Sequence, residues 1–151
     1  MLSFKGQVST EYLVILAIVL VVALVVVYLV GGFSGLGSGS LEAQSKSYWG
    51  SVSPLAIKSY KVSGTTMELD IANNDLEQIT VTDVSVGNSS VFSTSTVISS
   101  GADTVVSATL GTTCGASGTP FTYSNVTITY NKGSISALKE TGSKPLVGKC
   151  S

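Results

Sequence analysis

Residues 12–30 read YLVILAIVLVVALVVVYLV, an unbroken run of nineteen apolar side chains. At ~1.5 Å per residue a helix of this length spans about 28 Å, close to the ~30 Å hydrocarbon core of a bilayer. The run is apolar on every side, which predicts a helix buried in lipid or at the centre of an assembly. Because the backbone in lipid must bond to itself, we expect a helix despite the many valines and isoleucines.

The chain as a whole is poor in charged residues. Only 11% of all residues are charged, whereas soluble domains average about 25%. The eight basic residues are all lysines, histidine is absent, and the net charge is −1. This composition lacks the basic face of a nucleic-acid binder, the commonest general base and the usual phosphate clamp. We therefore predict neither an enzyme nor a nucleic-acid partner, and we expect no cofactor and no metal.

Three interpretations of the apolar run are open on the residues alone. A secretory signal peptide has a shorter apolar region and ends at an A-x-A-like site, which the following VGGFSGLGSGS lacks. A plain membrane anchor fits the length, and Lys5 before the run favours a cytoplasmic N-terminus. Neither interpretation requires Glu11 at the edge of the run, although a carboxylate there suits the positive end of a helix.

The third interpretation comes from the string around Glu11. Lys5-Gly6 is followed by Gln7, Ser9 and Glu11 at alternate positions and then by the long apolar helix. This arrangement resembles the class III signal peptide of archaeal type IV pilins, in the adhesive pilus subunit family. The resemblance covers about 25 residues at the N-terminus.

The resemblance implies a cut by a prepilin peptidase between Gly6 and Gln7, with residues 1–6 as the leader and residues 7–50 as the N-terminal helix. Glu11 becomes the fifth residue of the mature chain, and its carboxylate needs a partner when buried in a filament. The family suggests the new amino group of Gln7 on a neighbouring subunit. Ile15 stands where the family pattern has leucine.

The implied protein is the structural subunit of a helical homo-oligomeric pilus, held in the membrane as a precursor and then displayed at the cell surface for adhesion. A minor pilin and an archaeal flagellin relative are variants of the same interpretation. The alternative is a membrane-anchored envelope or binding protein with the same topology and no filament.

The stretch after the apolar run is glycine-rich and has two interpretations. Its composition is typical of a flexible linker. Small residues also recur every four positions, as in a small-xxx-small helix-packing seam. The members of this seam are Gly31, Gly35, Gly39, Ala43 and Ser47. We favour a continuous or kinked helix to about Tyr48, with Gly50 and Pro54 ending any helix.

Residues 53–151 change to a period of two, as half-buried strands do. The clearest strands are 57–62 and 67–71 around a turn, followed by 79–86. Further strands are expected at 91–92, 96–98, 104–110, 121–130 and 134–138. About seven short strands with regular turns predict a small antiparallel sandwich. Residues 69–81 resemble the start of the immunoglobulin-like domains of archaeal pilins. The predicted fold class is α+β, a long hydrophobic helix followed by an immunoglobulin-like β-sandwich.

Cys114 and Cys150 are the two cysteines. They lie too far apart for a CxxC motif or a zinc cluster. Two buried free thiols remain open, and a disulfide is favoured if the domain lies outside the cell. In the chain-entropy model, closing a loop of about 37 residues contributes roughly 4 kcal/mol.

Two sequons, Asn88-Ser89-Ser90 and Asn125-Val126-Thr127, are candidate N-glycosylation sites outside a cell. We prefer Asn88, which follows a turn glycine, because Asn125 begins a strand-like run. Several aromatic residues could form an adhesive patch, but we expect them to fill the core or the helix–domain junction. They are Tyr48, Trp49, Phe92, Phe121 and Tyr123. The aspartates lack the spacing of a calcium loop and are assigned to turns and the surface.

Overall fold

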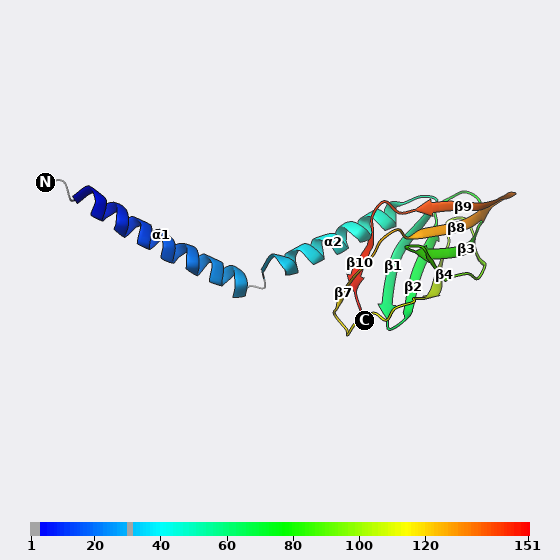
Figure 1. Cartoon of the computed structure of the whole chain (residues 1–151). Helices are drawn as coiled ribbons and strands as arrows, with labels where there is room; N and C mark the ends of the chain where they lie inside the picture. The colour runs from blue at the N-terminus through cyan, green and yellow to red at the C-terminus, as the bar shows by residue number, and fades with distance from the viewer. Residues whose placement is uncertain (1–3, 30–31) are drawn as a thin grey trace. The chain divides into compact units, whose positions relative to one another are not determined.

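The computed structural model describes residues 4–29 and 32–151, and the side chains of residues 9–29 and 39–151. The chain contains two compact units, Met1–Gly39 and Ser40–Ser151. Within these described residues two helices, α1 (Phe4–Leu29) and α2 (Gly32–Ser51), precede ten strands; Figure 1 shows their order along the chain. The predicted α+β class, an apolar helix followed by an antiparallel β-sandwich, is confirmed.

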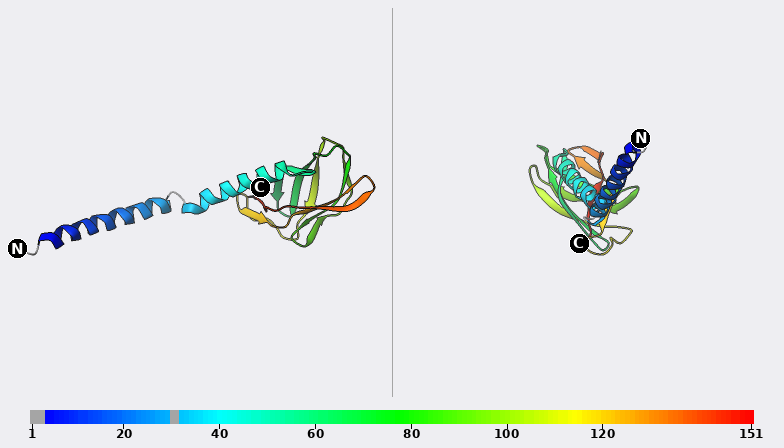
Figure 2. Two further views of the ribbon diagram at one scale, coloured as in Figure 1. Left: turned by 90° about the horizontal axis from the view of Figure 1, so that it is seen from above. Right: turned by 90° about the vertical axis from the view of Figure 1, so that its left-hand side faces the viewer.

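The described strands all pair antiparallel, and they form three sheets. Figure 2 shows the strands from two further sides. The first sheet has the order β1-β2-β6, with β1 (Leu55–Ser63), β2 (Thr66–Asn73) and β6 (Asp103–Thr109). The second has the order β4-β3-β8-β9, with β5 also paired to β3; its strands are β3 (Ile79–Val86), β4 (Ser89–Phe92), β5 (Thr96–Ile98), β8 (Thr127–Lys132) and β9 (Ile135–Thr141). The third pairs β7 (Pro120–Tyr123) with β10 (Leu146–Lys149).

The core of the sandwich follows from the period-two pattern of these strands. In β2 buried and exposed side chains alternate from Thr66 to Leu69, and β6 alternates in the same way from Val105 to Thr109. Inward-facing aliphatic side chains of the two larger sheets meet in one cluster. Its fully buried members include Val62, Met67, Leu69, Ile71, Ile79, Val81, Val84 and Ile128. Burial of this apolar area is the main force that holds the sheets together.

The aromatic residues lie where we expected them. Trp49 has no exposed surface and Phe121 is 9% exposed, so both belong to the core. Tyr48, Phe92 and Tyr123 are partly buried and pack against the same cluster. Phe121 stacks on Tyr123 with ring centroids 5.0 Å apart. An adhesive aromatic patch made of these five side chains is therefore excluded.

The strand predictions are partly wrong. The expected strand 121–130 is two strands, β7 and β8, which belong to different sheets. The break falls at Asn125, an exposed residue with φ of 53°. Asparagine tolerates this left-handed conformation better than most residues, and the conformation lies outside the region of φ and ψ that extended strands occupy. Strand β10 was not predicted. The turn between β8 and β9 contains Gly133 and Ser134, because Lys132 still belongs to β8.

The glycine-rich stretch is helical from Gly32 to Ser51, so the linker interpretation is wrong for these residues. The last turns are fixed by packing, since Ser45 and Trp49 are both buried. Gly31 lies outside the described residues, so the seam it was predicted to begin is described only from Gly35 onward.

Candidate functional site

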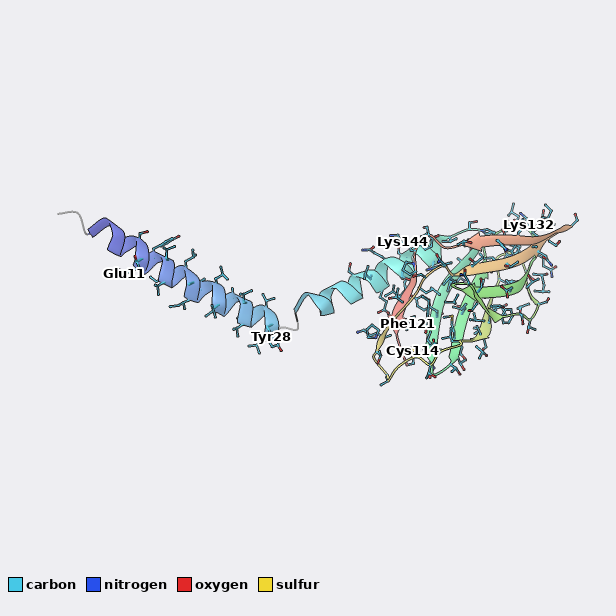
Figure 3. The ribbon with its side chains drawn as sticks, in the orientation of Figure 1. Glu11, Tyr28, Cys114, Phe121, Lys132 and Lys144 are labelled. Atoms are coloured by element: carbon cyan, nitrogen blue, oxygen red, sulfur yellow. A yellow bond between two sulfur atoms is a disulfide. The ribbon has the colours of Figure 1, made fainter. Side chains whose placement is uncertain are left out.

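The apolar surface of α1 is the most unusual feature of the molecule. From Ser9 to Leu29 the helix is long and apolar enough to cross a membrane, and none of its side chains is buried. The large apolar side chains of this segment are between 43% and 83% exposed, the extremes being Val27 and Tyr28 (Figure 3). A helix that is apolar all round needs lipid or other helices to cover it. The segment is therefore a candidate membrane anchor or signal.

Glu11 lies at the start of this apolar surface. It is exposed and borders a hollow of about 310 Å³ together with Thr10, Val14 and Ile15. Gln7 precedes it by one helical turn, and Gly6 and Gln7 both lie in the first turns of α1. The structure thus places the proposed cleavage position and the glutamate on one continuous helix.

The small-residue seam lies on α2. Gly35, Gly39, Ala43 and Ser47 are spaced by four in one helix and therefore lie along one stripe. Outside the helix's own neighbouring backbone, no atom of the described residues comes within 4 Å of the position that a Cβ on Gly39 would take. Ala43 and Ser47 are exposed and border a hollow of about 500 Å³ with Tyr48 and Lys144. The seam is open to a close neighbour, and its role in helix packing stays a prediction.

The opposite side of α2 is attached to the sandwich through Ser45. This serine is 2% exposed, and its hydroxyl donates to the Pro145 carbonyl at 2.8 Å. The Val147 amide donates to the same hydroxyl at 3.1 Å, and the Tyr60 hydroxyl lies 3.2 Å away. Sequence reasoning missed Ser45, because a serine in a polar helix gives no sign of which face is buried.

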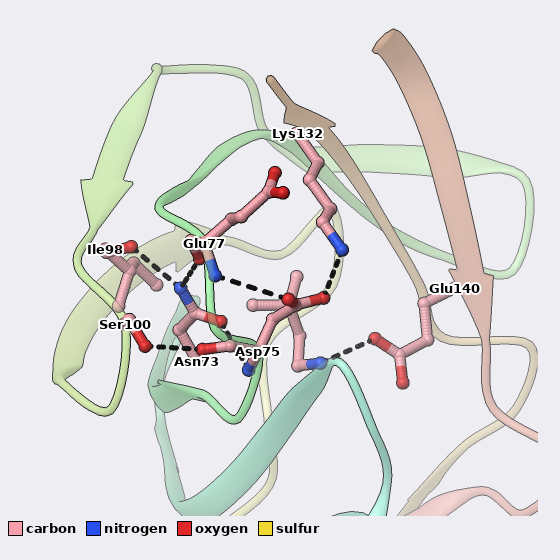
Figure 4. A network of polar contacts seen from close by, with 8 residues as sticks. Asn73, Asp75, Glu77, Ile98, Ser100, Lys132 and Glu140 are labelled. Carbon is pink, nitrogen blue, oxygen red and sulfur yellow. Dashed lines mark hydrogen bonds and ion pairs between the residues drawn. The ribbon is translucent and has the colours of Figure 1, made fainter. Parts of the chain in front are cut away.

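A polar network joins the turn after β2 to the neighbouring strands (Figure 4). Asn73 has no exposed surface and donates to the carbonyls of Glu77 and Ile98 at 2.8 and 3.0 Å. The Asp75 carboxylate accepts from the Lys132 ammonium at 2.6 Å, and this bond holds the pKa of Asp75 below its ordinary value. The same bond raises the pKa of Lys132. Asp75 is therefore a turn residue, as predicted, and it is ionised and paired.

Glu140 is a buried carboxyl group that sequence reasoning missed. It is 9% exposed, and the Leu55 amide donates to its Oε2 at 3.1 Å. Its Oε1 is buried and has no hydrogen-bond partner. Burial raises the pKa of Glu140 to about 7, and the Leu55 hydrogen bond lowers it only in part. A signal was present, because Glu140 lies two residues after Leu138 and so on the same face of the strand.

Cys114 and Cys150 form a disulfide, with Cα atoms 5.8 Å apart and both residues buried. The free-thiol alternative is therefore wrong. Figure 3 labels Cys114. The bond ties the loop after β6 to the end of the chain. Backbone hydrogen bonds surround it: the Gly118 amide donates to the Cys150 carbonyl, and the Cys150 amide donates to Thr119, each at 2.8 Å.

The two sequon asparagines are both exposed on loops. Asn88 lies in the turn between β3 and β4, as expected, and the hydroxyl of Ser90 in that sequon donates to Asp83. Asn125 lies in the bend between β7 and β8 and does not begin a strand. Both stay candidate glycosylation sites, and the loop position removes our reason for preferring Asn88.

Among the described residues, no group of three or more histidine, cysteine, aspartate or glutamate side chains is placed to hold a metal ion. Comparison of the chain with protein-family models, curated proteins and solved structures finds no match.

Proposed function

We propose that the chain is the structural subunit of an archaeal type IV pilus, cut by a prepilin peptidase and polymerised through its N-terminal helix. The observation that carries the proposal is the uncovered apolar helix Ser9–Leu29 with Glu11 near its start. Such a surface is stable in two environments, a bilayer before assembly and a core of packed helices afterwards.

The placement of Glu11 supports the filament more than a plain anchor. A plain anchor gains only the interaction of the carboxylate with the positive end of its helix, whereas a charge buried in a filament is costly unless it is paired. The amino group created by cutting before Gln7 supplies such a pair between subunits. The small-residue stripe of α2 adds a second surface that another helix can approach closely.

A disulfide and a hydroxyl-rich sandwich support display outside the cell, because disulfides persist in oxidising compartments. These features fit equally a membrane-anchored envelope protein that forms no filament, which is the second candidate. A minor pilin shares every feature named here. Adhesion is what the family resemblance implies, and no surface of the described residues identifies what the filament would bind.

The first test is N-terminal sequencing of sheared extracellular material and of the membrane fraction. The pilin proposal expects mature chains that begin at Gln7 in the sheared filaments. Chains that begin at Met1, found solely in membranes, would show that the protein is an anchored precursor that is never processed.

The second test substitutes the carboxylate. Glu11→Ala is expected to leave membrane insertion unchanged, because the apolar run is intact, and to reduce filament yield at least tenfold. Filaments are counted by electron microscopy, and insertion is measured by membrane fractionation. Glu68→Ala is the matched control, since Glu68 is an exposed glutamate on β2. Filaments of normal number from the Glu11 variant would contradict the assembly role.

A further inference from the structure

The end of β9 meets the joint between α2 and β1 at a single buried carboxyl group. Glu140 reaches Leu55, the first residue of β1, four residues after α2 ends at Ser51. Trp49, in the last turn of α2, packs on Gly142, two residues beyond Glu140 in the chain. Two buried polar atoms at this joint, Oε1 of Glu140 and Nε1 of Trp49, have no hydrogen-bond partner among the residues that the structure describes.

We propose that Glu140 is a proton-controlled latch, which holds the joint between α2 and β1 closed when its carboxyl is neutral and loosens the joint when it ionises. The neutral form satisfies the Leu55 amide through one oxygen and carries no net charge into the core. The ionised form keeps the same hydrogen bond but leaves a buried charge with a single backbone donor, which is unfavourable.

The groups around Glu140 do not neutralise that charge. From β8, Tyr130 is the titratable side chain that interacts electrostatically with it, and a phenol supplies no positive charge. The charges of Asp75 and Lys132 also influence the pKa of Tyr130, but these two residues are already paired with each other. From α2, the Tyr48 hydroxyl accepts a hydrogen bond from the Ser143 amide, and β1 contributes the Leu55 amide. Among the described residues no lysine forms an ion pair with Glu140.

The direction of the pH effect follows from the two states of the joint. In an open, hydrated joint the carboxyl ionises near its ordinary pKa of 4.5, and in the closed joint near 7. Between these values the closed state binds more protons, so its stability falls as the pH rises and levels off above about 7. The latch is therefore closed in acid and loosest in neutral to alkaline solution.

The test measures amide hydrogen exchange of the full chain in detergent micelles from pH 5 to pH 8. After correction for the intrinsic exchange rate, the protection factor of the Leu55 amide is expected to fall on the order of 50-fold, with the Leu69 amide as a reference that does not change. Trp49 is the single tryptophan of the chain, so its emission reports on the same joint with the same midpoint. The proposal does not depend on filament formation.

Glu140→Gln keeps the shape of the side chain and removes its charge, so it is expected to abolish both pH effects. Glu68→Gln, on the exposed face of β2, is expected to keep them. Constant Leu55 protection in the wild type, or an unchanged midpoint in Glu140→Gln, overturns the proposal. If Glu140→Gln does not fold, carboxyl ¹³C NMR of the wild type decides: one of the five glutamates titrating near pH 7 supports the latch, and all five titrating below about pH 5.5 overturns it.

Discussion

Replacing both Cys114 and Cys150 with serine is expected to lower the free energy of unfolding of the sandwich by about 4 kcal/mol. The bond spans 36 positions of the chain, and in the chain-entropy model its loss frees the corresponding loop in the unfolded state. Urea titration of the full chain in detergent, followed by Trp49 fluorescence, measures the change. Since the loss is a large fraction of the stability of a small domain, the midpoint should move to much lower urea.

The matched control for this prediction is chemical reduction. Reduced wild-type chain should unfold at nearly the same urea concentration as the double serine variant, and the variant itself should not respond to reductant. If the oxidised and the reduced wild type unfold at the same urea concentration, the disulfide does not contribute to stability, and the surrounding hydrogen bonds are enough to hold the end of the chain. Those bonds include the Ser151 amide donating to Val62 at 2.9 Å.

The features that the sequence predicts well are those whose signal is local. The apolar run is recognised without knowledge of any contact, because its length and composition alone mark it as a candidate membrane-spanning helix. The β1–β2 hairpin was equally clear, since two alternating strands flank the Ser63-Gly64 turn and Gly64 has the positive φ that glycine allows. The apolar core residues of these strands follow from the period of two.

The features that the sequence did not predict depend on contacts distant in the chain. Strand β10 contains Gly148, where an added Cβ would come within 2.8 Å of the Phe121 ring, so its glycine marks a close approach to β7. Composition alone suggests a loop there. The disulfide stayed open because spacing does not show that the fold brings Cys114 next to Cys150. Glu140 was overlooked because a glutamate on a strand is usually exposed.

Trp49→Ala is expected to lower the free energy of unfolding by about 3–5 kcal/mol, because it removes a completely buried indole and leaves a cavity. Gly142 allows this ring to occupy its site. A Cβ on Gly142 would overlap Cζ2 and Cη2 of Trp49, closer than any real Cβ contact. Gly142→Ala is therefore expected to lower the free energy of unfolding of the sandwich by about 1–3 kcal/mol or more, as overpacked cores typically do.

The free energy of unfolding of each variant, including those without tryptophan, is measured by circular dichroism during a urea titration. Gly50→Ala is the matched control, because a Cβ there meets no atom within 4 Å, and an alanine in the last turn of α2 should be neutral or slightly stabilising.

The double variant Trp49→Ala/Gly142→Ala tests the contact itself. Once the indole is absent, the new methyl group has nothing to collide with and fills part of the cavity. The two losses should therefore be less than additive, by about 1 kcal/mol or more. Strict additivity would mean that Gly142 is required for a reason other than the ring. A coupled pair instead identifies Trp49 and Gly142 as the contact that fastens the end of α2 to the sandwich.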